Sequence, residues 1–180
     1  MGASVLGIAI AVVPLAVLVA GVARRVLHGT RSPEVPVAAR APIGPTAPRE
    51  PLIGRPAPLV EGVDLSGQPA RADLSGRVLL AFLTGSCEPC QRFWSGLAEG
   101  RDPGAAVVVV TPSPSTESPR ALGRLAGPAT PVVMGSEVWI AYEALVAPWF
   151  VLVDGGLVLA EGRAESWEQL ASLVGTPLAP

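Results

Sequence analysis

The chain contains no lysine, only one histidine and only two cysteines among its 180 residues. All 13 basic residues are therefore arginines, and eight of them lie after residue 53 together with 13 acidic residues. Proteins that bind nucleic acid place clusters of cations against the phosphates. An acidic main portion without a basic stripe argues against nucleic acid as a partner.

The scarcity of cysteine and histidine also limits metal binding. Tetrahedral zinc takes four Cys, His or acidic ligands, whereas Cys87 and Cys90 have no second pair and His28 lies far away in the sequence. We therefore expect no metal and no other cofactor. An inert structural staple is disfavoured as well, because a bridge between Cys87 and Cys90 encloses few residues and restrains the unfolded chain little.

The spacing of the two cysteines indicates redox chemistry. They form the only C-x-x-C pair, directly after an apolar run and at the start of a predicted helix. Such a pair can close a small disulfide, and the helix N-terminus stabilises a thiolate on the first cysteine.

The N-terminus carries a long uncharged stretch from Ala3 to Ala23, which is enough to cross a bilayer as a helix. A cleaved signal peptide usually has basic residues before its apolar core, whereas here Arg24 and Arg25 follow the stretch. We predict a transmembrane anchor over residues 1–28, with cleavage after Ala23 as the alternative.

Residues 29–53 have a different character, because prolines are scattered through them without apolar periodicity. Chain of this kind is extended and partly stiff, so we predict a proline-rich linker that holds the next domain away from the membrane. A proline-rich ligand for a partner domain is the alternative. Residues 54–180 have a suitable length for one compact domain.

Periodicity within residues 54–180 predicts an α/β domain. The apolar runs 78–83 and 106–110 lack alternation, which is typical of strands buried on both faces of a sheet. A helix from Cys87 to about Ala98 lies between them, with Pro89 in its first turn, where a missing amide proton costs nothing. Strand, helix and strand in this order imply a right-handed crossover and parallel pairing.

Two β-hairpins and a last helix complete the prediction. The first hairpin covers residues 59–72, and the second joins strands 149–153 and 157–161 through the turn residues 154–156. A helix over residues 165–174 is expected to bury one face, formed by Trp167, Leu170, Ala171 and Val174.

This order of elements resembles the thioredoxin superfamily, and more narrowly the membrane-anchored TlpA/ResA-type thiol-disulfide oxidoreductases. The resemblance covers nearly all of residues 54–175 and implies a thioredoxin-like fold, a central mixed sheet flanked by helices. The segments that carry it are Gly54-Arg55-Pro56-Ala57-Pro58, Leu65-Ser66-Gly67, Phe82 before Cys87-Glu88-Pro89-Cys90, and Ala147 to Asp154 leading into Gly155-Gly156.

The resemblance implies a role for each site residue. Cys87 is the expected nucleophile, which forms a mixed disulfide that Cys90 then resolves. Pro148 matches the family's cis-proline beside the disulfide, and the backbone of Ala147 is expected to pair with a bound substrate chain. Glu88 and Pro89 are the supporting residues between the two cysteines.

Three positions depart from the family pattern. Ser86 stands where a tryptophan often precedes the first cysteine, and Ala81 and Phe93 stand where members of the family carry a buried acid. The buried proton shuttle is therefore expected to be missing. Glu88 is the nearest carboxylate in sequence, and its charge disfavours a thiolate at Cys87.

We expect a membrane-tethered enzyme that reduces disulfides of client proteins and is itself reduced by an upstream thiol donor. Cytochrome maturation and an accessory role for a dehydrogenase both suit the resemblance. A peroxiredoxin-like peroxidase is an alternative because Thr84 and Cys87 fit a T-x-x-C spacing, although Leu80 replaces the expected proline and Cys90 is too close to be a distant resolving cysteine. A second alternative is a Cu(I) metallochaperone, since soft thiolates suit that ion.

The side of the membrane is indicated in two opposite ways. Arginines after the predicted span and none before it favour a cytoplasmic domain. The family resemblance favours the extracytoplasmic side, where disulfides persist. We expect a single-pass protein with its domain outside the cytoplasm.

Overall fold

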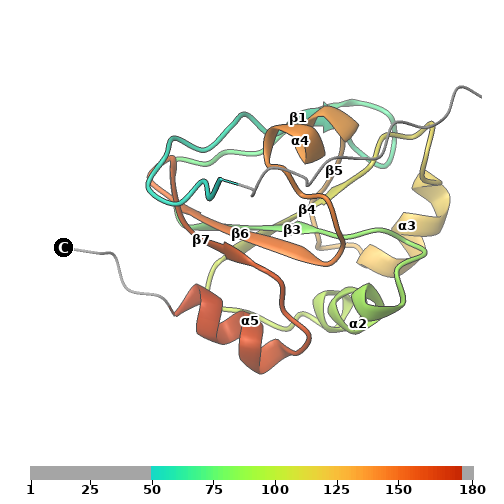
Figure 1. The fold of residues 1–180 in the computed structure, drawn as a ribbon. Helices are drawn as coiled ribbons and strands as arrows, with labels where there is room; N and C mark the ends of the chain where they lie inside the picture. The colour runs from blue at the N-terminus through green and yellow to red at the C-terminus, as the bar shows by residue number, and fades with distance from the viewer. Residues whose placement is uncertain (1–49, 176–180) are drawn as a thin grey trace, which may run out of the picture. The chain divides into compact units, whose positions relative to one another are not determined.

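The computed structural model describes residues 50–175. The predicted membrane span and most of the predicted linker lie outside these residues. Within residues 50–175, no helix combines the length and the apolar character that crossing a bilayer requires. These residues form a mixed β-sheet with helices on both faces (Figure 1).

The sheet has seven strands in the order β2-β1-β5-β4-β3-β6-β7. Strands β3, β4 and β5 are parallel to one another, and the other neighbours are antiparallel. The strands are β1 (Glu61–Val63), β2 (Pro69–Arg71), β3 (Val78–Phe82), β4 (Ala106–Thr111), β5 (Val132–Met134), β6 (Trp149–Asp154) and β7 (Leu157–Gly162). The helices are the 3-10 helix η1 (Glu88–Cys90), α2 (Gln91–Ala98), α3 (Pro119–Ala126), α4 (Ser136–Ala141) and α5 (Trp167–Val174).

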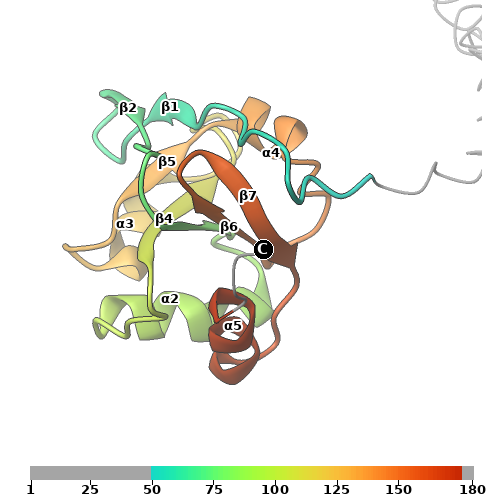
Figure 2. The ribbon, with the colours of Figure 1, turned by 90° about the vertical axis from the view of Figure 1, so that its left-hand side faces the viewer.

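The central strand β3 is buried along its whole length and supplies both halves of the core. Because strand side chains alternate between faces, Leu79 and Ala81 join the cluster under α2 and α5, whereas Leu80 and Phe82 join the cluster under α4. Figure 2 shows α2 and α5 on one side of the sheet and α4 on the other. A strand packed on both faces needs an unbroken apolar run, as the sequence indicated.

The strands that the sequence predicts are confirmed. The two apolar runs form β3 and β4, which pair in parallel, and the two hairpins are β1–β2 and β6–β7. Gly155 and Gly156 join β6 to β7 with φ angles of 55° and 78°. Glycine adopts such angles without steric cost, which explains the tight turn.

Two local predictions differ from the structure. The helix expected from Cys87 is divided into the short 3-10 turn η1 and the α-helix α2, which begins at Gln91. In α5, Leu170 and Val174 are buried as expected, but Ala171 is exposed and Leu173 is partly buried in its place. The buried face of α5 therefore differs from the predicted face at one position, where Leu173 takes the place of Ala171.

Candidate active site

Cys87 and Cys90 form a disulfide at the carboxyl end of β3. The chain leaves β3 after Phe82 and reaches Cys87 directly before η1, and Cys90 is the last residue of that turn. The Cα atoms of the two cysteines are 5.2 Å apart. Cys90 is 0% exposed, whereas Cys87 is partly exposed. Only the first sulfur is therefore open to a partner molecule.

The helix start directs amide hydrogens at the first cysteine. The Cys90 N–H donates to Cys87 Sγ at 3.2 Å and to the Cys87 carbonyl oxygen at 3.1 Å. Pro89 lies in the first turn, where its missing N–H leaves no hydrogen bond unmade. After reduction, an amide donor and the positive end of a helix dipole at this sulfur stabilise a thiolate.

Side chains from two other elements hold the loop that leads to Cys87. Trp94 Nε1 donates to the Thr84 carbonyl oxygen at 3.2 Å, and Gln91 Nε2 donates to the Gly85 carbonyl oxygen at 2.9 Å. The Gly85 N–H donates to Glu117 Oε1 at 3.3 Å. Sequence reasoning missed these three side chains. Gln91 and Trp94 lie in the first turn of α2, so their proximity to the loop could have been suspected, whereas nothing local connects Glu117 to it.

The peptide bond between Ala147 and Pro148 is cis, as the resemblance implied. Trp149, the next residue, pairs with Phe82 at the end of β3. The strand register therefore brings Pro148 to the edge of the sheet from which the cysteine loop departs. Ala147 and Cys87 both pack against the cluster that contains Cys90. The tertiary structure thus brings together the residues that the sequence analysis selected.

The floor of the site is apolar. Phe93 is 0% exposed and makes an edge-to-face contact with Phe150, with ring centroids 4.8 Å apart. Ala81 is 1% exposed in the same cluster. The two positions at which the resembled family carries a buried acid therefore hold buried apolar side chains in this structure.

The residues that flank the first cysteine are polar and open to solvent. Ser86 and Glu88 are both exposed. Arg92, the nearest arginine in sequence, donates from Nη1 to the Glu165 carbonyl oxygen at the start of the α5 region. This hydrogen bond directs the guanidinium toward α5. It does not direct the positive charge toward Cys87.

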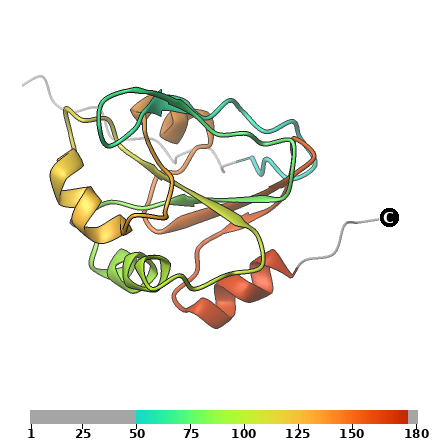
Figure 3. The ribbon, with the colours of Figure 1, turned by 180° about the vertical axis from the view of Figure 1, so that it is seen from behind.

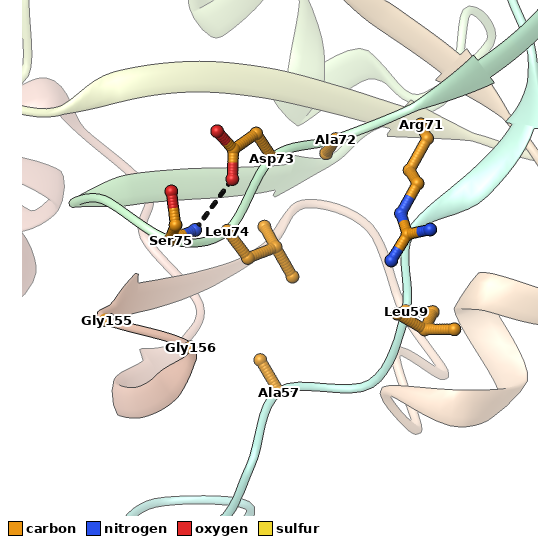
Figure 4. A pocket seen from close by; sticks show the side chains of 9 residues that line it. All are labelled: Ala57, Leu59, Arg71, Ala72, Asp73, Leu74, Ser75, Gly155 and Gly156. Atoms are coloured by element: carbon orange, nitrogen blue, oxygen red, sulfur yellow. Dashed lines mark hydrogen bonds between the residues drawn. The ribbon is translucent and has the colours of Figure 1, made fainter.

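The part of the chain that the structure describes offers no cluster of three or more Cys, His, Asp or Glu side chains suited to a metal ion. An open pocket of about 520 Å³ borders the Gly155–Gly156 turn (Figure 4). It lies at the end of β6 opposite Trp149, and therefore away from the cysteines. Its charged groups are engaged, because Arg71 pairs with Glu61 at 3.3 Å and Asp73 accepts the Ser75 N–H at 2.9 Å. The disulfide is the better candidate for chemistry.

Comparison with known proteins gives one curated relative and many structural neighbours. No protein-family profile matches the chain. Over 130 residues it is 32% identical to the methylamine utilization protein MauD of Paracoccus denitrificans, and the match covers 69% of this chain. The chain spans 65% of the length of MauD, somewhat less than two thirds.

Two solved structures are similar to the described domain. One is the solution structure of a thiol:disulfide interchange protein from Bacteroides sp., with a TM-score of 0.55 and 20% identity over 69% of this chain and 91% of that one. The other is the crystal structure of the thioredoxin domain of a thiol-disulfide oxidoreductase from Bacteroides vulgatus, with a TM-score of 0.53 and 20% identity over 68% of this chain and 98% of that one. At this level of identity, the likeness establishes the thioredoxin-like fold alone.

Proposed function

We propose that the chain is a thioredoxin-like thiol-disulfide oxidoreductase that reduces disulfides of client proteins through Cys87 and Cys90; its thioredoxin-like fold and its similarity to MauD support the proposal. The observation that carries the proposal is the disulfide between a partly exposed and a fully buried cysteine at a helix start. This asymmetry gives the two sulfurs different tasks. The structure holds the oxidised form, which is the product of client reduction.

The reaction begins from the dithiol, with Cys87 as a thiolate. Its sulfur attacks one sulfur of the client disulfide, so that the client S–S bond breaks and a bond between Cys87 Sγ and the client forms. The departing client sulfur leaves with the electron pair and takes a proton from solvent. Cys87 is the attacking residue because it is partly exposed and its sulfur accepts a hydrogen bond from the Cys90 N–H.

Cys90 completes the exchange. After it loses its proton, its thiolate attacks Cys87 Sγ, the mixed disulfide breaks, and the second client sulfur leaves as a thiol after protonation. The client gains two electrons and two protons, and the dithiol becomes the Cys87–Cys90 disulfide. An upstream thiol donor supplies two electrons and two protons to restore the dithiol. Burial of Cys90 keeps external disulfides from reaching it, so it serves the intramolecular step.

The neighbouring cis peptide is the proposed binding position for the client chain. Ala147 is partly exposed, and the strand register places it at the same edge of the sheet as Cys87. We assign its backbone to pair with the client segment, with Pro148 packed beside the disulfide. Glu88 and Pro89 support the site by setting the charge and the start of the helix.

The location of the protein in the cell is part of the same proposal. A membrane anchor over residues 1–28 and a linker over residues 29–53 would present the domain from residue 54 onward to clients outside the cytoplasm. MauD is named for methylamine utilization. This similarity favours the accessory role for a dehydrogenase over cytochrome maturation.

Trapping of mixed disulfides tests the assignment of the two cysteines. A Cys90→Ser variant of the full chain should accumulate mixed disulfides with client proteins, because the Cys87 adduct then has no intramolecular exit. A Cys87→Ser variant should trap at least tenfold less. Non-reducing gel electrophoresis after acid quenching, followed by mass spectrometry of the adducts, measures both.

Equal trapping by the two variants contradicts the assignment of Cys87 as the nucleophile. Alkylation of the wild-type chain provides the control, since two thiols should react after reduction and none after mild oxidation. Two free thiols after treatment with a strong disulfide donor would refute the redox function itself. Consumption of hydrogen peroxide faster than reduction of a client disulfide would instead support the peroxidase alternative.

A further inference from the structure

Gly85 is held from both sides by side chains, two residues before Cys87. Its carbonyl oxygen accepts a hydrogen bond from Gln91 of α2, and its N–H donates to the carboxylate of Glu117. Both polar groups of this backbone unit are therefore satisfied by side chains instead of by a strand or helix. The carboxylate comes from a segment 32 residues away in the sequence.

Glu117 is placed by the start of α3. Its N–H donates to the Ser113 carbonyl oxygen at 3.0 Å, and the next residue, Ser118, caps α3 by accepting the Ala121 N–H at 3.3 Å. A carboxylate at this end of a helix is favourable in the field of the helix dipole. Helix α3 lies beside α2, as Figure 3 shows from behind. Glu117 therefore occupies a fixed place between α3 and the cysteine loop.

Glu117 also lies close to the Cα atom of Gly85. A Cβ atom added there would lie 3.1 Å from Glu117 Oε2, so the carboxylate would have to shift by a few tenths of an ångström, and 3.4 Å from Leu122 Cδ2 of α3. Glu117 is itself partly buried. Its negative charge is consequently less screened by water than that of a fully exposed carboxylate.

Positions 81 and 93, where the resembled family carries a buried acid, are apolar here. The charged residues of the loop and of the helices beside it are Glu88 next to Cys87, Arg92 on α2, which donates toward α5, Arg120 and Arg124 on α3, and Glu117 directly before α3. Among these charged side chains, Glu117 is the one with a hydrogen bond to the loop of residues 84–87 in the described part of the chain. Glu117 Oε1 lies 3.3 Å from the Gly85 nitrogen, and two residues of backbone span at most about 7 Å, so the carboxylate lies within about 10 Å of the Cys87 backbone nitrogen, a distance comparable to the Debye length of about 8 Å at physiological ionic strength.

We propose that Glu117 is a positioning residue that clamps Gly85 and, through its charge, disfavours the thiolate of Cys87 and keeps the pair reducing. The inference rests on the proposed thiol-disulfide exchange. Glu117 does not touch the sulfur atoms; it acts through Gly85 and through its field. Its carboxylate comes from the segment directly before α3, whereas the two positions at which the resembled family carries a buried acid lie in β3 and α2.

The relevant equilibrium is exchange with glutathione. The protein disulfide and two molecules of reduced glutathione give the protein dithiol and one molecule of oxidised glutathione, so two electrons and two protons move to the protein. Any group that disfavours the Cys87 thiolate destabilises the reduced protein. Removing the Glu117 charge should therefore shift this equilibrium toward the dithiol.

The test compares the full-length chain with the variants Glu117→Gln, Glu117→Ala and Glu99→Gln in detergent solution. Glutamine retains an oxygen that can accept the Gly85 N–H, and Glu99 is an exposed carboxylate at the far end of α2. For Glu117→Gln we expect an equilibrium constant with glutathione at least threefold higher and thiolate absorbance that appears at lower pH. Glu117→Ala should shift the equilibrium constant and the thiolate titration in the same direction. Because it also removes the hydrogen bond to Gly85, it should slow the attack of Cys90 on the mixed disulfide. Glu99→Gln should match the wild type.

An unchanged equilibrium and an unchanged thiolate titration in Glu117→Gln, or equal changes in Glu99→Gln, would overturn the proposal for Glu117 while the wild type still cycles. If the wild-type pair fails to exchange with glutathione at all, the proposed function fails and not the role of Glu117 alone. An unfolding midpoint measured for each variant separates a charge effect from loss of the fold, and Glu117→Gln should keep the wild-type midpoint.

Discussion

At the scale of single residues, the two cysteines differ in what surrounds them. Cys87 receives a hydrogen bond from the Cys90 N–H and lies partly in solvent, whereas Cys90 is fully buried. The amide and the helix dipole stabilise a thiolate at Cys87. Glu88 beside it disfavours the same thiolate, and the Arg92 guanidinium is directed elsewhere. From these opposing effects we expect a thiolate that is only moderately stabilised.

We therefore expect a reducing pair. Strong oxidants of this fold have a highly stabilised first thiolate, so the wild-type potential should lie nearer the thioredoxin value of about −270 mV than the DsbA value of about −120 mV. Neutralising the neighbouring charge in Glu88→Gln should raise the potential by roughly 10–20 mV, which corresponds to about twofold to fivefold in the equilibrium constant. Equilibration in a graded series of glutathione buffers measures both.

The control for this prediction is Glu165→Gln, since Glu165 is exposed and lies in the segment before α5. It should leave the potential within error of the wild type. A wild-type potential above about −180 mV, the value for protein disulfide isomerase, is incompatible with the reducing assignment.

At the scale of elements, α5 contacts α2 through Trp167, whose ring lies against Gly96 and 5.6 Å from the Phe93 ring. A Cβ atom on Gly96 would lie 2.3 Å from Trp167 Cζ2. The indole also donates from Nε1 to the Arg92 carbonyl oxygen at 3.1 Å, and Arg101 lies over its ring at 5.2 Å. Trp167 is thus held on three sides. A side chain at position 96 would compete with the Trp167 ring for the same space.

Gly96→Ala should therefore destabilise the protein, although alanine favours an isolated helix by about 0.5–1 kcal/mol over glycine. Overpacking of this kind costs about 1–3 kcal/mol, and the indole cannot move without losing its hydrogen bond. Urea unfolding followed by Trp fluorescence measures the free energy of unfolding.

Gly123→Ala in α3 is the matched control. Gly123 is exposed, and the nearest atom to an added Cβ is Leu65 Cδ1 at 3.8 Å, an ordinary contact. This substitution should stabilise the protein by about 0.5–1 kcal/mol through the helix preference alone. If both substitutions stabilise the protein, the contact between Gly96 and Trp167 does not control the packing of α5.

At the scale of the whole molecule, the chain has very few groups that titrate in the alkaline range. It contains no lysine and a single tyrosine, and its two cysteines are joined in a disulfide. Tyr142 is fully buried and donates its hydroxyl hydrogen to the Pro58 carbonyl oxygen at 2.7 Å. Burial raises the pKa of Tyr142 above its ordinary value of 10.0, because the phenolate is disfavoured in the interior.

The oxidised protein should consequently lose stability above about pH 10. Below the unfolded pKa, both states hold the phenol proton and the contribution of Tyr142 is complete. Above it, the unfolded chain releases the proton while the folded chain retains it, so the free energy of unfolding falls by at most about 1.4 kcal/mol per pH unit. Urea unfolding at a series of pH values from 8 to 11.5 measures the slope.

Tyr142→Phe removes the titrating group. It should begin about 1 kcal/mol less stable through the lost hydrogen bond and show a flatter dependence above pH 10. Arginine side chains stay protonated in this range. A Tyr142→Phe variant that loses stability as steeply as the wild type would show that another group controls alkaline unfolding.

The elements that were predicted from sequence share a strong local signal. The apolar run of β3 predicts burial on both faces, the glycines at 155 and 156 predict a tight turn, and Pro89 after Cys87 indicates the start of a helix. The region between β4 and Pro148 was not assigned residue by residue. Its strand β5 has three residues and its helix α4 has six, which is too short for apolar periodicity to separate helix from strand.

By itself the sequence determined the α/β order of the domain and the pairing of Cys87 with Cys90, because each depends on residue types within a few positions. Only the tertiary structure decided that Glu117 reaches Gly85 and that Gly96 receives Trp167. These contacts join positions 32 and 71 residues apart. They arise from the way helices pack on a sheet, and no local pattern records where a side chain from a distant element will come to lie.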